Sequence, residues 1–169
     1  KAPVTDPANK DNLQDLQQKI IADSRWKASK DHIYKQVKDK AGVKILLQDD
    51  AGFNAYSDSL LDHKPMQVAG RNLTASTPVF SIGTEVYDLS AWYNYATVYR
   101  FRPDGSGAKS HEQAREEWLQ YAMFEYYKEH LEEFNEEFRN QMAEFRDGNL
   151  FFEVMQQEVW TKAQADTTA

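Results

Sequence analysis

The sequence contains no cysteine, which excludes disulfide bridges, thiolate nucleophiles and zinc sites built on cysteine. It also lacks any apolar run near the roughly 20 residues that a membrane-spanning helix needs, so membrane insertion is not expected. A phosphate-binding loop of the Walker type and a Gly-x-Gly-x-x-Gly string are both missing, so nucleotide binding is not expected either.

Basic residues are outnumbered, with 20 Lys and Arg against 27 Asp and Glu and a formal net charge of -7. Nucleic-acid binding rests on cationic side chains that neutralise phosphates, so this balance argues against it, and equally against anionic lipid. The four histidines are scattered, and none has a second His or a Glu at the spacing of a zinc or di-iron helix. We therefore predict no catalytic residue, metal or cofactor at His32, His63, His111 and His130.

What the chain does have is enough apolar material for a packed interior. Its 169 residues are 41% hydrophobic and 13% aromatic, which is typical of one domain or two small ones sharing a core. The best internal boundary is the polar, breaker-rich stretch 62–77. We therefore predict a leading helical segment over 1–64 and a hairpin-plus-long-helix module over 65–169, which can share one core.

The stretch 110–162 carries the strongest pattern. Its apolar residues recur at steps of three and four, which predicts an α-helix. Ser110 is placed to cap it, and Gly148 predicts a kink or a change of helix. Strict heptads are not sustained, so a two-stranded coiled coil is the weaker interpretation. The many glutamates between the apolar positions are interpreted as a solvated helix face.

Shorter elements precede this stretch. Residues 1–10 read as an extended lead-in, and 11–40 as one bent helix or two, ended by Gly42. The run 43–47 is too short to assign to helix or strand.

A short helix is predicted over 51–61 and a β-hairpin over 79–87, turning at Gly83-Thr84. Asp88 then caps a helix that runs to about Phe101, and 103–107 forms a turn. The predicted fold class is mainly α (α+β), with long helices and one small hairpin.

Aromatic residues are dense in two places, the helix after Asp88 and the start of the long helix. Burial in the core is the default interpretation of these rings. Left partly open, they would form a cradle that binds unfolded polypeptide reversibly and with little sequence preference. The candidate client-binding residues are Trp92, Tyr93, Tyr95, Tyr99, Phe101, Trp118, Tyr121 and Phe124.

Three segments resemble a known family. Phe145-Arg-Asp-Gly-Asn-Leu-Phe-Phe-Glu-Val-Met155, with the Val-Trp-Thr-Lys-Ala string that ends at Ala163, resembles a segment of secreted parvulin-type peptidyl-prolyl isomerases. It is most similar to the large SurA-related proteins of the Bacteroidetes. The hairpin 79–87 resembles the start of a SurA-type chaperone module, and Ile20-Ile-Ala-Asp-Ser-Arg25 resembles the helix that follows a parvulin domain in this group.

The resemblance implies a chaperone portion without the isomerase domain, because the Gly-Gly-Asp-Leu-Gly-like and Gly-x-His-Ile-like strings of parvulin domains are missing. It implies ATP-independent binding of unfolded envelope and outer-membrane proteins in the periplasm, within a larger peptidyl-prolyl isomerase that is exported. Since the sequence starts at Lys1 without Met, we expect a mature form or an excised piece. Two alternatives remain open: an isomerase active in its own right, and an architectural segment that forms a homodimer.

Overall fold

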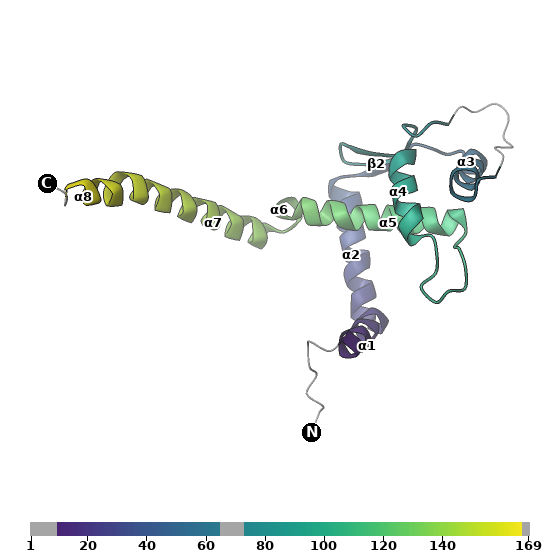
Figure 1. The fold of residues 1–169 in the computed structure, drawn as a ribbon, viewed down its shortest axis with the longest axis horizontal. Helices are drawn as coiled ribbons and strands as arrows, with labels where there is room; N and C mark the ends of the chain where they lie inside the picture. Colours follow the sequence, from purple (N-terminus) through teal and green to yellow (C-terminus); the bar gives the residue numbers. More distant parts are fainter. Residues whose placement is uncertain (1–9, 65–72, 167–169) are drawn as a thin grey trace, which may run out of the picture. The chain divides into compact units, whose positions relative to one another are not determined.

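The computed structural model describes residues 10–64 and 73–166 (Figure 1). The chain divides into two compact units, Lys1–Tyr126 and Tyr127–Ala169. Helices predominate and a small antiparallel sheet accompanies them, so the predicted mainly α (α+β) class is confirmed. The extended segment was predicted over 1–10; residues 1–9 lie outside the described residues, and Lys10 is the first residue of a helix. The centre of the predicted boundary, 65–72, also lies outside them.

The first unit begins with two helices, α1 (Lys10–Ala22) and α2 (Ser24–Lys40). They are separated at Asp23, whose carboxylate accepts the backbone N–H of Arg25 and so caps α2. The stretch 11–40 is thus two helices rather than one bent helix. Gly42, at φ +80°, donates its N–H to the Val37 carbonyl and ends α2 as predicted.

A three-stranded sheet forms the centre of this unit, in the order β1 (Val43–Ile45), β2 (Pro78–Ile82), β3 (Glu85–Asp88). The predicted hairpin is β2–β3, with Gly83 in its turn at φ +58°. The undecided run 43–47 supplies β1, which pairs antiparallel with β2. The predicted ranges 1–64 and 65–169 therefore share one sheet.

The remaining helices of the unit are α3 (Asp50–Asp62), α4 (Leu89–Tyr99) and the first part of α5 (His111–Glu129). Of these, α5 packs against β2 through Trp118 and Phe80, and α3 packs against α4 through Phe53 and Trp92. Both predicted caps are present: Asp88 accepts the N–H groups of Ser90 and Ala91, and Ser110 Oγ accepts that of Gln113. The largest fully buried side chains come from β2 and all four neighbouring helices: Trp92, Phe53, Phe80, Ile82, Leu89, Met123, Val37 and Val79.

The second unit is a run of helices, α6 (Leu131–Phe134), α7 (Glu136–Met155), the π-helical turn η1 (Gln156–Trp160) and α8 (Thr161–Asp166). Of the two alternatives predicted at Gly148, the change of helix is wrong, because Gly148 lies inside α7, and the kink stays a prediction. The predicted helix is interrupted earlier, by a turn at His130 and again at Asn135, where extended backbone lets the side chain accept the Phe138 N–H and cap a new helix. A glycine in a helix interior lowers the stability of the helix by only about 1 kcal/mol relative to alanine, so it does not have to end the helix.

Candidate functional site

The structure divides the eight predicted client-binding residues into three groups. Trp92 and Trp118 are core residues rather than surface residues, at 0% and 3% exposure. Tyr95 is nearly buried and Phe124 is half-buried. The residues with rings open to solvent are Tyr93, Tyr99, Phe101 and Tyr121.

Trp92 is buried because its neighbours satisfy both the ring and its N–H group. The ring packs 4.9 Å from Phe53 and 5.5 Å from Trp118, measured between centroids. Its Nε1–H donates to Ser57 Oγ at 2.9 Å, and Ser57 donates in turn to the Phe53 carbonyl at 2.8 Å. A buried indole needs such a partner. The sequence analysis did not single out Ser57, which supplies it.

Four of the predicted residues, Tyr95, Tyr99, Tyr121 and Phe124, border two hollows on the surface of the first unit. The larger, which we call the α2–α5 groove, has a volume of about 490 Å³. Tyr95 and Tyr121 contribute to its lining, together with residues spaced one turn apart along α2. The full lining is Trp26, Lys30, Tyr34, Tyr95, Glu117, Gln120, Tyr121 and Phe124.

The smaller hollow, which we call the α4–α5 hollow, has a volume of about 310 Å³. Tyr95, Tyr99 and Tyr121 meet beside it, with centroid separations of 5.0 to 5.6 Å. Because Tyr95 and Tyr121 line both hollows, this tyrosine pair forms the wall between them. The full lining is Tyr87, Ala91, Asn94, Tyr95, Tyr99, Trp118, Tyr121, Ala122 and Glu125.

Few charges reach the α2–α5 groove. Burial, reinforced by the Glu117 carboxylate, raises the pKa of Tyr95 to about 12, so this ring stays a neutral phenol at physiological pH. Glu117 forms an ion pair with Lys109 and accepts a hydrogen bond from Gln113. Lys30 lies over the ring of Tyr34, 5.9 Å from its centroid. The groove is thus a depression lined mainly by aromatic rings, with Lys30, Glu117 and Gln120 also in its lining.

The predicted set therefore needs revision at this surface. Tyr93 and Phe101 are exposed but line neither hollow. Trp26 and Tyr34, which the prediction omitted, form the α2 wall of the groove. Their spacing of eight residues, two helical turns, was visible in the sequence. What it did not show is that this face of α2 lies opposite α5.

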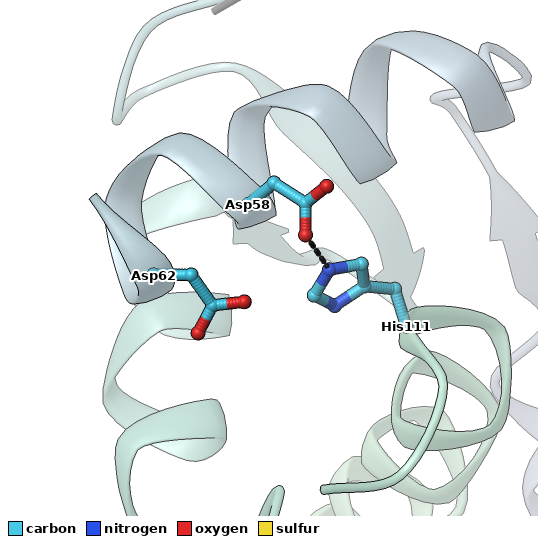
Figure 2. A group of neighbouring side chains, drawn as sticks. All are labelled: Asp58, Asp62 and His111. Carbon is cyan, nitrogen blue, oxygen red and sulfur yellow. Dashed lines mark hydrogen bonds and ion pairs between the residues drawn. The ribbon is translucent and has the colours of Figure 1, made fainter. Parts of the chain in front are cut away.

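A second cluster lies where the last turn of α3 meets the start of α5 (Figure 2). In the part of the chain that the structure describes, Asp58, Asp62 and His111 form the group with metal-ligand character, their ligand atoms lying within 4.8 Å of one another. His111 Nε2 lies 2.8 Å from Asp58 Oδ1, and the Asp62 side chain projects toward the same side (Figure 2).

These carboxylates already have cationic partners. Lys64 Nζ lies 3.1 Å from Asp58 Oδ1, and an Arg100 guanidinium nitrogen lies 2.6 Å from Asp62 Oδ1. The hydrogen bond with His111 and then that with Lys64 lower the pKa of Asp58, and the bond from Arg100 lowers that of Asp62. A metal ion would have to displace both cations. We therefore interpret the cluster as an ion-pair network that ties α3 to α4 and α5.

Between residues 10 and 64 and between 73 and 166, no helix is both long and apolar enough to cross a membrane. Comparison with protein-family models, curated proteins and solved structures finds no match to this chain.

Proposed function

We propose that this chain is the helical chaperone portion of a SurA-like, parvulin-type peptidyl-prolyl isomerase, and that it holds unfolded envelope and outer-membrane proteins in the periplasm without ATP. The observation that carries the proposal is the α2–α5 groove. It is an open, aromatic-walled depression of about 490 Å³ with no catalytic arrangement among its lining residues.

The groove suits unfolded chains for physical reasons. Contiguous exposed apolar surface on a soluble protein marks an interaction site more often than chance. Each apolar client side chain placed against these rings contributes about 1.5 to 3 kcal/mol before ordering costs, which gives weak and reversible binding. Rings also accept many side-chain shapes, so little client sequence preference follows.

The sequence supports the same role independently. The segment 145–163 and the hairpin 79–87 resemble SurA-related proteins, and the chain lacks parvulin catalytic strings. A nucleotide-binding loop is missing as well, which agrees with holding rather than ATP-driven remodelling. Periplasmic location and membership in a larger isomerase rest on this resemblance.

The test is binding of a fluorescently labelled, aromatic-rich unfolded peptide, measured by anisotropy. Tyr121→Ala and Trp26→Ala remove groove walls at residues about 40% exposed, so both variants should fold. We expect each to raise Kd about 5- to 10-fold, which corresponds to about 1 to 1.4 kcal/mol of lost contact. Tyr93→Ala is the matched control, an equally exposed tyrosine outside both hollows, and should leave Kd unchanged.

Two results would remove the groove from the proposal. One is equal loss of binding in the Tyr93→Ala control, which would point to a diffuse aromatic effect. The other is full binding by folded Tyr121→Ala and Trp26→Ala proteins.

One observation favours a second candidate, an architectural role through self-association of α7. Phe145 and Phe152 are 63% and 56% exposed. They lie on a stripe of five residues at alternating steps of four and three, the spacing of a coiled-coil seam. The stripe is Phe138, Met142, Phe145, Asn149 and Phe152.

Light scattering tests this candidate. A homodimer through the stripe predicts twice the monomer mass at tens of micromolar, and Phe145→Asp should return the mass to that of a monomer. Phe151→Asp is the control, because Phe151 is as exposed but lies on another side of α7. A monomeric wild-type protein at every concentration rules the homodimer out.

A further inference from the structure

The sheet of the first unit ends on one side at β1, and the bonds from β1 to β2 fix which way its backbone groups point. Gly42 accepts the Gly83 N–H at 3.0 Å, and Leu46 donates its N–H to the Val79 carbonyl at 2.9 Å. In an antiparallel ladder, hydrogen-bonded pairs alternate with pairs that are not bonded. Lys44 therefore also faces β2, and the residues on either side of it face away.

These two outward-facing residues are Val43 and Ile45, whose partners in the register are Ile82 and Phe80. Among the residues that the structure describes, no backbone group bonds to the outward N–H and C=O groups of Val43 and Ile45. Each of the two residues thus offers one donor and one acceptor, and they stand about 6.6 Å apart along the strand. Such a row of groups is a template for a further strand.

A hollow of about 370 Å³, which we call the β1–α5 hollow, adjoins the same edge. Ile45 and its partner Phe80 lie on the sheet face against which α5 packs, because Phe80 is 4.5 Å from Trp118 between ring centroids. The apolar part of the lining is Ile45, Val79, Phe80 and Leu119, and the charged part is Glu112, Arg115 and Glu116. This volume is near the lower end of the range for ligand pockets, about 300 to 1,000 Å³, so the hollow suits one side chain.

The opposite edge of the sheet, β3, offers less. Ser81 directs its backbone groups toward Lys44, so it is the non-bonded partner of Val86, which faces outward. Beyond Tyr87 the strand ends at Asp88, the cap of α4. The β3 edge therefore has one outward-facing residue in the strand, and β1 has two with a hollow beside them.

We propose that β1 binds an extended segment of an unfolded polypeptide by strand addition, with one apolar side chain of that segment in the β1–α5 hollow. Donors and acceptors that alternate at strand spacing are the complement of an extended polypeptide backbone. Alternate side chains of an added strand point to the same sheet face, which brings every second one toward α5. That the segment belongs to a client rests on the proposed function, and the shortness of β1 keeps the pairing reversible.

The test is a backbone scan of a labelled, threonine-rich peptide with one central leucine, measured by anisotropy. Threonine favours an extended chain, and the single leucine fixes the register by entering the hollow. Each peptide of the series carries one N-methylated residue. N-methylation at residues whose N–H faces β1 should raise Kd about 5- to 10-fold, and N-methylation at the residues between them should change Kd less than about twofold. This alternation with a period of two is specific to strand addition.

Three variants locate the added strand. Ile45→Pro removes an outward N–H of β1 and leaves the bonds to β2 in place, which is where an edge strand tolerates proline. Ile45→Ala removes the same side chain and keeps the N–H, so the difference between the two variants reports the backbone. We expect Ile45→Pro to raise Kd about fivefold beyond Ile45→Ala. Val86→Pro, the matched change at the β3 edge, should leave Kd unchanged.

The outcomes separate this inference from the proposed function. A flat scan, or no binding of the leucine peptide while the aromatic-rich peptide still binds, overturns strand addition and leaves the chaperone proposal standing. Equal loss in Val86→Pro overturns the choice of β1. Failure of both peptides to bind overturns both proposals. A wild-type dimer that Ile45→Pro converts to a monomer, by light scattering, means that a second copy occupies the edge and also overturns the inference.

Discussion

Ser57 is a small residue whose burial determines how a much larger one is held. Its Oγ accepts the Trp92 Nε1–H, and both side chains are fully buried. Ser57→Ala leaves that donor without a partner in a dry environment, which should lower the free energy of unfolding by about 1 to 3 kcal/mol.

A double-mutant cycle measured by chemical denaturation checks this expectation. In a Trp92→Phe background the indole donor is gone, so Ser57→Ala should lower the free energy of unfolding distinctly less than it does in the wild type. An equal cost in both backgrounds would show that the hydrogen bond contributes nothing and that the loss comes from packing alone.

The ion-pair network at the end of α3 predicts how stability depends on pH. Asp58 and Asp62 both have a folded-state pKa below the ordinary value, through His111 and Lys64 for the first and through Arg100 for the second. Their stabilisation is therefore fully present above the unfolded-state pKa of about 4 and is lost as the pH falls through the folded-state values. Because both carboxylates are substantially exposed, solvent screening keeps the effect small.

Denaturation at a series of pH values from 6 to 2.5 measures this effect. The free energy of unfolding should decline below about pH 4, and the decline should be shallower in Asp62→Asn, which cannot titrate at that position. An identical pH profile for the wild type and for Asp62→Asn would show that the Arg100 pair contributes no pH dependence.

At the scale of elements, helix caps, helix ends and turns could be predicted from the sequence, because a few adjacent residues determine them. Asp88 as an N-cap, Gly42 as a helix end and Gly83 in a hairpin turn each depend on a few adjacent residues, and the structure confirms all three. The pairing of β1 with β2 was not predictable in this way, because Val43 and Ile82 meet across nearly 40 residues of sequence. The sequence analysis missed the helix break at Asn135 because apolar residues recur at helical spacing on both sides of it. Gly148 was therefore the more prominent candidate for a helix break.

The same contrast applies to the candidate site. Aromatic density singled out α4 and α5, whose residues line both hollows, but it did not show which rings face outward. Trp92 and Trp118 are buried through contacts with α3 and β2, elements that lie far from them in sequence. Trp26 became part of the site only through the packing of α2 near α5. Non-local packing therefore decides which aromatic residues reach the surface.

The β2–β3 hairpin depends on Gly83 for two separable reasons. Its φ of +58° disfavours any side chain, and an added Cβ would lie 2.6 Å from the Tyr126 hydroxyl. Gly42 shares the positive φ, at +80°, but a Cβ there meets nothing within 4 Å. Gly42→Ala should therefore lower the free energy of unfolding by about 1 kcal/mol, from backbone strain alone. Gly83→Ala should lower it by about 2 to 3 kcal/mol, because the contact with Tyr126 adds to the strain.

Thermal unfolding of both alanine variants, and of Gly83→Ala combined with Tyr126→Phe, tests this separation. Removing the Tyr126 hydroxyl should restore much of the melting temperature that Gly83→Ala loses beyond Gly42→Ala. Equal melting temperatures for the two single variants would mean that Tyr126 moves aside at no cost.

At the scale of the whole molecule, the two units differ in how their helices are stabilised. The first unit has a core that draws on β2 and four helices, whereas α7, η1 and α8 bury no side chain. Among the described residues of the second unit, Phe134 is the buried one, against Tyr127 at a centroid distance of 5.1 Å. Most helices in proteins depend on packing rather than on propensity, so α7 is held by its Asn135 cap and its surface ion pairs.

This difference predicts a steep gradient in amide hydrogen exchange. Amides of α4 and of the early turns of α5 should exchange only through global unfolding, while those of α7 and α8 should exchange orders of magnitude faster through local opening. Exchange followed by mass spectrometry at high and low protein concentration tests the self-association proposed for α7. Fast exchange at both concentrations means that the exposed face of α7 is free in the isolated chain. Protection that appears only at high concentration, and that Phe145→Asp abolishes while Phe151→Asp does not, means that a second copy covers it. Slow exchange at every dilution would contradict the solvent-exposed α7 described above, because a helix with no buried side chain has nothing else to protect its amides.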